Sequence, residues 1–120
     1  MTTEHYLSYD LDKEVILYKK NINDPISPAS ITKLMTALIL YENSELDDMV
    51  SISYPDQYDF QGKVAYLNEG NVISIEQLLE FILVYSANDS AYAAGMHVSN
   101  SIKDFVQLMN TRAKQLNMSN

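Results

Sequence analysis

Two short runs of strand-forming residues open the chain. Residues 6–10 and 14–19 are rich in Leu, Ile, Val and Tyr, which favour extended backbone. The stretch from Asp10 to Lys13 between them predicts a turn, although it contains no glycine. We therefore expect an N-terminal β-hairpin. Because two strands alone are marginally stable in water, we also expect more sheet beside it.

The most apolar helix of the sequence is predicted to begin near Ser30 and to run to about Tyr41. Asn, Asp, Pro and Ser residues mark positions 21–28 as a loop, and Pro25 and Pro28 discourage helix before Ser30. Apolar residues then occupy nearly every side of the helix: Ile31, Leu34, Met35, Ala37, Leu38, Ile39 and Leu40. A helix with so little polar surface is usually buried on several sides. We expect it to be a central helix.

Three further helices follow from the helical spacing of apolar residues. The first has a capping box of Ser74 and Gln77, a hydrophobic staple of Ile73 and Leu78, and an apolar stripe: Ile75, Leu78, Leu79, Ile82 and Leu83. It is predicted to end at residues 86–89. A helix of small residues comes next, and the last helix begins near Ser101 and ends at Asn117, which accepts the left-handed cap. Its predicted apolar face is Ile102, Phe105, Val106, Met109, Ala113 and Leu116.

The middle of the chain carries weaker signals. The acidic residues 42–48 predict a solvated loop rather than a metal site. Val50, Ile52 and Tyr54 alternate with serines, which weakly indicates a strand. Residues 55–62 predict a polar loop, in which Asp56 and Asp59 have no evident partner.

Composition narrows the classes of function. The 120 residues carry a net charge of −8, which argues against nucleic acid and against acidic membrane surfaces as partners. The chain has no cysteine, which excludes disulfides and thiolate metal sites. His5 and His97 have no partners at metal-ligand spacing, so we expect no metal site. No apolar run is long enough for a transmembrane segment, and the N-terminus lacks the pattern of a signal peptide.

Ser30 and Lys33 are the first candidates for chemistry. Residues three apart on a helix lie on one face, within reach of each other. Ser30 falls at the predicted helix start, where free N–H groups and the helix dipole favour negative charge near its oxygen. A serine needs a base to become a nucleophile, and a lysine serves if burial lowers its pKa. Ile31, Leu34 and Met35 are candidates for that desolvation. The alternative interpretation is a helix cap at Ser30 and a solvated Lys33.

A second motif, Ser86-Ala87-Asn88, completes a pair that occurs in penicillin-binding proteins and class A β-lactamases. The amino-acid sequence around both motifs resembles that of the D-alanyl-D-alanine carboxypeptidases, the low-molecular-mass penicillin-binding proteins of the serine peptidase S11 type. The similar segments are residues 28–37, 78–91 and 105–118, with the predicted hairpin as lead-in. Ala87 and Asn117 stand where the family often has glycine.

The resemblance implies an α+β fold of helices packed against an antiparallel sheet, and acyl transfer through an ester on Ser30. Lys33 would be the base, and Ser86 would pass a proton to the leaving amine. Asn88 would orient Lys33 and bind the substrate amide, while the Ser30 N–H would supply half of an oxyanion hole. The implied partners are the D-Ala-D-Ala ends of peptidoglycan stem peptides and β-lactams. The implied location is the cell envelope, outside the cytoplasm.

One element of the family pattern is absent from this sequence. No lysine is followed by Thr-Gly or Ser-Gly, and the family carries that triplet on a later strand, where it binds the substrate carboxylate. We therefore expect residues 1–120 to form an incomplete catalytic domain that lacks the C-terminal sheet strands. Catalysis by the chain alone is expected to be weak or absent. Apolar surface left uncovered on the helix of residues 31–41 would make the chain marginally stable or cause self-association through this exposed core face.

Two other functions remain open from the sequence. A non-catalytic fragment or interaction module would retain the helices as packing units, and the missing triplet favours it. A serine β-lactamase is the other enzyme class, but class A enzymes have Ser-Asp-Asn where this chain has Ser86-Ala87-Asn88.

Overall fold

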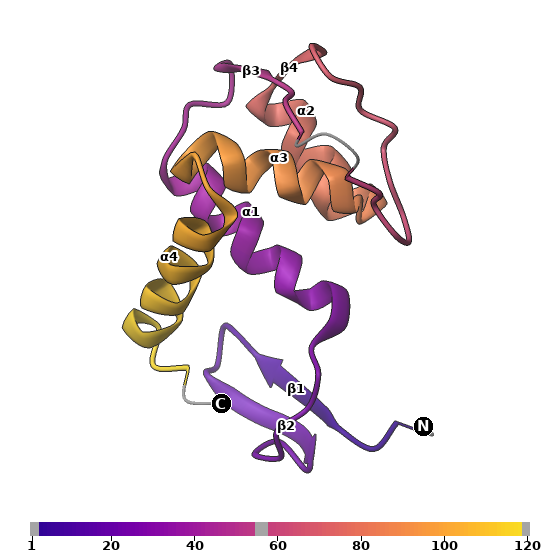
Figure 1. The fold of residues 1–120 in the computed structure, drawn as a ribbon. Coiled ribbons are helices and arrows are strands. Elements are labelled where there is room, and N and C mark those ends of the chain that lie inside the picture. The colour runs from indigo at the N-terminus through magenta and orange to yellow at the C-terminus, as the bar shows by residue number, and fades with distance from the viewer. Residues whose placement is uncertain (1–2, 55–57, 119–120) are drawn as a thin grey trace.

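A computed structural model describes residues 3–54 and 58–118, in which four α-helices accompany two small antiparallel sheets (Figure 1). This is the predicted α+β class. The elements in order are β1 (Tyr6–Asp10), β2 (Val15–Lys20), the 3-10 turn η1 (Ala29–Ile31), α1 (Thr32–Glu42), β3 (Met49–Ser51), β4 (Val72–Ser74), α2 (Ile75–Glu80), the π-helical turn η2 (Phe81–Tyr85), α3 (Asn88–Ser99) and α4 (Ile102–Gln115).

The predicted N-terminal hairpin is confirmed. β1 and β2 pair antiparallel from Tyr6 opposite Lys20 to Asp10 opposite Val15, with an irregularity in the register after Ser8. The turn forms without glycine because the Asp10 carboxylate stabilises it, accepting hydrogen bonds from the N–H groups of Asp12 and Lys13 at 3.1 and 3.0 Å. Glu14 then adopts a left-handed conformation, with φ of 53°.

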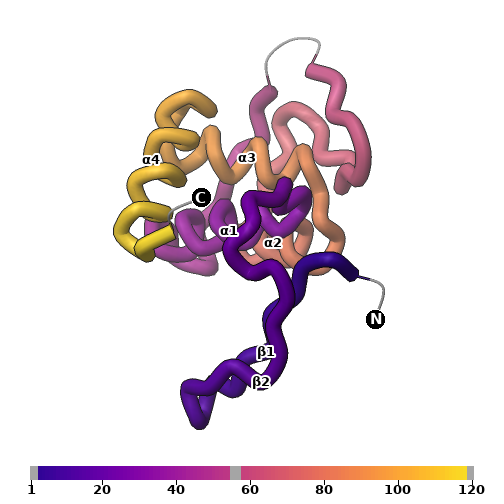
Figure 2. Tube along the Cα trace, turned by 90° about the horizontal axis from the view of Figure 1, so that it is seen from below, coloured from indigo at the N-terminus to yellow at the C-terminus, as the bar shows by residue number. Residues whose placement is uncertain are grey.

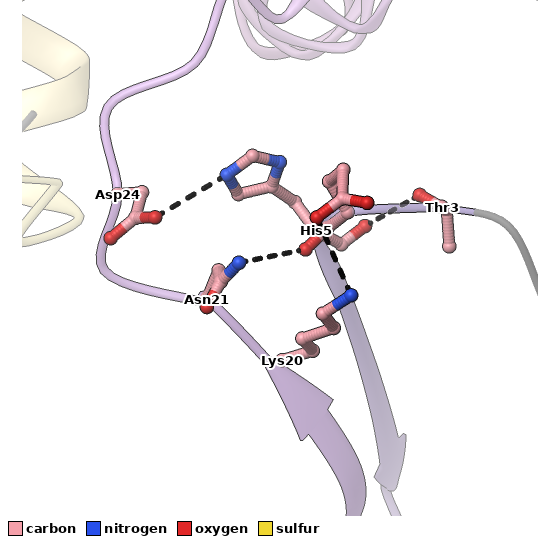
Figure 3. A network of polar contacts seen from close by, with 6 residues as sticks. Thr3, His5, Lys20, Asn21 and Asp24 are labelled. Carbon is pink, nitrogen blue, oxygen red and sulfur yellow. Dashed lines mark hydrogen bonds and ion pairs between the residues drawn. The ribbon is translucent and has the colours of Figure 1, made fainter.

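Polar contacts join the open end of the hairpin to the loop that leads to Ser30 (Figure 3). The Lys20 ammonium lies 3.4 Å from the Glu4 carboxylate, and the Asn21 side-chain amide donates to the Glu4 carbonyl. His5 Nε2 lies 3.5 Å from Asp24 Oδ2. Such exposed pairs each contribute only about 0–1 kcal/mol to the free energy of folding. Their main effect is to set the path of the loop relative to the hairpin. The hairpin itself projects from the helical body (Figure 2).

The core lies between the second half of α1, the helices α2 and α3, and the small sheet of β3 and β4. It consists of nine buried apolar residues: Ala37, Leu40, Val50, Ile52, Ile75, Leu78, Ile82, Ala93 and Ala94. The turn η1 and the first turn of α1 are different, because Ile31 in η1 is 68% exposed and Leu34 in α1 is 60% exposed. The buried residues of the helix therefore lie between Thr36 and Leu40, and the exposed apolar side chains before them agree with the expectation that some apolar surface of this helix is left uncovered.

The capping box at the start of α2 is confirmed: Ser74 Oγ accepts from the Gln77 N–H, and the Gln77 side chain accepts from the Ser74 N–H. The predicted regular helix widens in its last turn to the π-helical η2, and Ser86 closes it with a left-handed φ of 61°. This widening leaves Leu83 51% exposed, although the stripe placed it on the buried face.

The last two helices pack closely, as the small residues of α3 predict. A side chain at Gly95 would meet the Phe105 ring at 3.0 Å, so only glycine fits there without movement. Ser101 caps α4 by accepting from the Asp104 N–H, and Asn117 takes the predicted left-handed conformation, with φ of 57°. On the predicted apolar face of α4 only Phe105 is fully buried, while Val106 and Leu116 are each 45% exposed.

Two sequence expectations in the middle of the chain need revision. Glu42 belongs to α1 rather than to a solvated loop, and it forms a two-pronged ion pair with Arg112 of α4. The strand that was weakly indicated by Val50, Ile52 and Tyr54 is observed only as the short β3, and its partner β4 was not predicted. The predicted loop 55–62 includes residues 55–57, so Asp56 lies outside the described residues, whereas Asp59 accepts a hydrogen bond from Gln61 at 2.7 Å. Within the described ranges no helix is long and apolar enough to cross a membrane.

The uneven burial of α1 gives a stability prediction. Leu40→Ala removes a fully buried side chain and should lower the free energy of unfolding by about 2–5 kcal/mol, because a cavity remains. Leu34→Ala, on the same helix but exposed, should change it by less than about 0.5 kcal/mol. Urea unfolding of both variants measures this, and equal losses would contradict the position of the core.

Candidate functional site

Ser30 and Lys33 lie at the solvent-facing end of α1. Ser30 is exposed in the turn η1, and Lys33 is in the first turn of the helix that follows. The residue before Ser30, Ala29, has a left-handed φ of 44°, which is unusual for alanine. This sharp bend brings the chain from the loop into the helix axis and leaves the Ser30 side chain in solvent.

Two clefts meet at this end of the helix, and both are lined by Ser30 and Lys33. The larger has a volume of about 710 Å³ and is also lined by Asn88, while the smaller, of about 290 Å³, is also lined by Ser86. The structure thus gathers all four predicted site residues around the start of α1. Across the described part of the chain, no hydrogen bond directly joins two of the four.

The electrostatic state of Lys33 fits a base. Desolvation by burial lowers the pKa of the Lys33 ammonium from its ordinary value of 10.5. The apolar groups beside it in the smaller cleft are Ile31, Leu34, Ile82 and Leu83. Ile31 and Leu34 are the neighbours expected from the sequence, whereas Ile82 and Leu83 come from η2. A lowered pKa increases the fraction of neutral amine that is able to accept a proton.

Ser86 owes its position to the π-helical turn. The N–H groups of Ser86 and Ala87 both donate to the Phe81 carbonyl, so the last turn of the helix is wider than a regular α-turn. The left-handed Ser86 then reverses the chain into α3. In this position Ser86 faces the cleft that it shares with Ser30 and Lys33.

Asn88 is the first residue of α3, and two contacts hold it. Its backbone N–H donates to the Lys63 carbonyl at 2.7 Å, and its side-chain Nδ2 donates to the Gln61 carbonyl. With Nδ2 engaged as a donor, Oδ1 is the atom of this amide that can accept a hydrogen bond from Lys33 or from a substrate N–H.

An aromatic cluster beside the site was missed by the sequence analysis, which gave Tyr side chains no particular role. Tyr54, Tyr58, Phe60 and Tyr92 pack with ring centroids 4.5–5.9 Å apart. Three of them, Tyr58, Phe60 and Tyr92, line the larger cleft with Gln61. The signal in the sequence is three aromatic residues within positions 54–60.

No metal-binding group emerges from the part of the chain that the structure describes: no three His, Cys, Asp or Glu side chains are arranged to hold an ion. The roles that the resemblance implies for the four candidate residues are those of a nucleophile, a base, a hydroxyl relay and a substrate-binding amide, for which we expect neither a metal nor an organic cofactor.

Comparison with known proteins decides the family. The family model described as D-alanyl-D-alanine carboxypeptidase, peptidase S11, matches residues 1–120. The chain belongs to this family. Its sequence is 32% identical over 114 residues to the D-alanyl-D-alanine carboxypeptidase DacF of Bacillus subtilis, covering 91% of this chain and 29% of that protein. It is 33% identical to a D-alanyl-D-alanine endopeptidase of Haemophilus influenzae, covering 96% of this chain and 40% of that protein.

Solved structures of carboxypeptidases and penicillin-binding proteins share the fold. The D-alanyl-D-alanine carboxypeptidase DacD of Francisella tularensis superposes with a TM-score of 0.91 at 28% identity, over 100% of this chain and 30% of that one. Penicillin-binding protein D2 of Listeria monocytogenes, in its ampicillin-bound form, gives a TM-score of 0.77 at 27% identity, over 97% of this chain and 47% of that one. The S11 chain described here thus spans about a third of the curated relatives named above.

The environment of Lys33 gives a prediction for its titration. The midpoint followed by NMR on the Lys33 side chain should fall below 10.5, because desolvation disfavours the ammonium. Leu83→Ser, which makes the smaller cleft more polar, should move that midpoint back toward 10.5. The unfolded chain binds this proton more tightly, so the contribution of Lys33 to stability should rise with pH between the two pKa values. A midpoint at or above 10.5 would contradict the assignment of Lys33 as base.

Proposed function

We propose that this S11 chain carries the nucleophile of a serine-type D-Ala-D-Ala carboxypeptidase that acts on peptidoglycan stem peptides. The observation that carries the proposal is that Ser30 and Lys33 share both clefts, with the Lys33 pKa lowered by desolvation. The names of the relatives support the reaction type. A peptidoglycan substrate would place the activity in the cell envelope.

The proposed reaction proceeds through an ester. Ser30 Oγ attacks the carbonyl carbon between the two terminal D-alanines while its proton passes to the neutral Lys33 amine. The developing oxyanion lies near the Ser30 N–H at the start of η1, where backbone donors are not used by the helix. When the C–N bond breaks, the Ser86 hydroxyl delivers its proton to the leaving amine and takes up the proton held by the Lys33 ammonium, so the amine leaves neutral and Lys33 becomes a base again. Asn88 Oδ1 accepts from a substrate N–H, and water later hydrolyses the ester.

We also propose that residues 1–120 correspond to one part of a larger catalytic domain of this family. The share of the relatives' length that the chain covers supports this. The sequence contains no Lys-Thr-Gly to bind the substrate carboxylate. Since one oxyanion donor alone is worth about 10²–10³ in rate, we expect weak turnover from these 120 residues.

Acylation by a β-lactam tests the proposal directly. After incubation with a labelled penicillin, the intact mass should show one stable adduct, because a β-lactam acylates the same serine. Ser30→Ala should abolish the adduct, whereas Ser27→Ala, three residues upstream in the exposed loop, should leave it unchanged. An adduct that survives in Ser30→Ala would contradict Ser30 as nucleophile. Rapid hydrolysis of the penicillin would instead identify a β-lactamase.

A second candidate function, an interaction module, is favoured by the exposed apolar surface of the hairpin. Leu7 is 56% exposed, Leu17 is 52% exposed and Tyr18 is 71% exposed, and the two strands contact mainly each other. Exposed apolar patches of this kind mark surfaces that bind protein. For these 120 residues we propose self-association through the hairpin.

Sedimentation velocity over a concentration series checks the self-association. The average mass should rise with concentration, and the pair of substitutions Leu7→Ser and Leu17→Ser should reduce that rise, because it removes apolar area from the hairpin. Leu46→Ser removes a leucine that is 44% exposed elsewhere on the molecule and should have no such effect. A parent chain that stays monomeric at all concentrations would exclude this proposal.

A further inference from the structure

Asp89 is a buried acid that the proposed reaction does not use. Its side chain is only 2% exposed, directly after Asn88 in the first turn of α3. None of the ion pairs found among the described residues includes Asp89. A buried carboxylate without a cation requires hydrogen-bond donors, and the structure supplies them from the backbone.

Two of those donors come from a segment far away in the sequence. The N–H of Ala65 donates to Asp89 Oδ1 at 2.9 Å, and the N–H of Leu67 donates to Asp89 Oδ2 at 3.1 Å. The Ser90 N–H also donates to Oδ1, at 2.8 Å. Each carboxylate oxygen thus holds one amide of the segment 61–67, which contains no helix and no strand.

The same segment holds Asn88. The carbonyls of Gln61 and Lys63 accept from the Asn88 side chain and backbone, so four hydrogen bonds connect residues 61–67 with the first two residues of α3. Two of them are made by the Asp89 carboxylate. Gly62 lies between these contacts with φ of +82°, and a side chain there would come within 3.1 Å of Asn88 Nδ2.

Tyr54 adds a further hydrogen bond to the contacts between residues 61–67 and the start of α3. Its hydroxyl donates to the Asp89 carbonyl at 3.4 Å. Burial, with the charges of Asp89 and Glu69, raises the pKa of Tyr54 well above its usual range, so the hydroxyl, protonated at neutral pH in any case, also remains a donor at alkaline pH.

We propose that Asp89 is a positioning residue: by fixing the amides of Ala65 and Leu67, it holds the segment 61–67 against α3 and so sets the orientation of the Asn88 side chain in the larger cleft. The consequence for Ser30 chemistry rests on the proposed function. Loss of the carboxylate removes two of the four hydrogen bonds, and the remaining two are both made by Asn88. Packing of Leu67 against the core holds only the far end of the segment, so the Asn88 amide then moves with residues 61–63. The structural half of the inference stands independently of catalysis.

Two pairs of variants test the proposal. Asp89→Asn keeps the shape of the side chain but replaces one acceptor by a donor, and Glu80→Gln is the matched loss of an exposed carboxylate. Gly62→Ala perturbs Asn88 from the other side without touching the buried charge. Gly70→Ala is its control, because Gly70 has nearly the same φ, +79°, and nothing within 4 Å of the added carbon.

Amide hydrogen exchange and the Asn88 side-chain NH₂ signals give the first readout. In Asp89→Asn, exchange at Ala65 and Leu67 should accelerate about tenfold or more, while the Leu40 and Ala94 amides of the core keep their protection. The Asn88 NH₂ signals should shift in Asp89→Asn and in Gly62→Ala but not in either control. Uniform acceleration across the core with unchanged Asn88 signals would overturn the proposal, because Asp89 would then serve stability alone.

The second readout is the acylation of Ser30 by a fluorescent penicillin, resolved into the binding constant and the acylation rate constant. Asp89→Asn and Gly62→Ala should each lower the acylation step by about tenfold, since misplacement of a substrate-binding group costs rate. Unchanged acylation in both, with displaced Asn88 signals, would overturn the catalytic half of the inference. If the parent chain forms no adduct, the proposed function fails, and the exchange data and the Asn88 signals still decide the role of Asp89.

Discussion

The burial of the second half of α1 is the constraint on which the site depends. Ile39 and Leu40 are 1% and 0% exposed, and α1 packs against α3 and η2. A helix is a stiff rod with a rise of about 1.5 Å per residue, so fixing Leu40 also fixes the Lys33 end about 10 Å away. The core thus determines where Ser30 and Lys33 stand, although Ser30 itself contacts solvent. Ser86 follows η2 directly, and Asn88 is the first residue of α3. The packing of α1 against these two elements therefore positions Ser86 and Asn88 relative to Ser30 and Lys33.

Local sequence signals predicted much of this arrangement. The hairpin, the capping box of α2, the left-handed Asn117 and the small-residue face of α3 depend on residues close in sequence, and each is found in the structure. The grouping of Ser30, Lys33, Ser86 and Asn88 followed from two short motifs and from family resemblance. The two clefts that these residues line were not predicted from the sequence.

The features that were missed depend on contacts between distant residues. The bonds from Asp89 to Ala65 and Leu67 span 24 and 22 positions, and no local pattern marks the acceptors or the donors. β4 exists because β3 is beside it, and the π-helical turn exists because Ser86 must close the helix where α3 begins. The exposure of Ile31 and Leu34 agrees with the expectation of uncovered apolar surface. That expectation came from the missing family triplet, because apolar periodicity reports which side chains prefer burial and not which elements are present to cover them.

Backbone strain on either side of the candidate site is explained by the need to hold Ser30 and Ser86 in fixed positions. Ala29 and Ser86 are both left-handed, a conformation that costs an L-residue about 1–2 kcal/mol and that glycine adopts freely. Glycine at either position would relieve the strain, but it would also add backbone freedom next to a residue that must be held still. Ala87, fully buried beside Ser86, and the packed second half of α1 provide contacts that outweigh the cost. Strain at these two junctions is therefore a consequence of holding Ser30 and Ser86 rigidly at the edge of a core that lies entirely on one side of them.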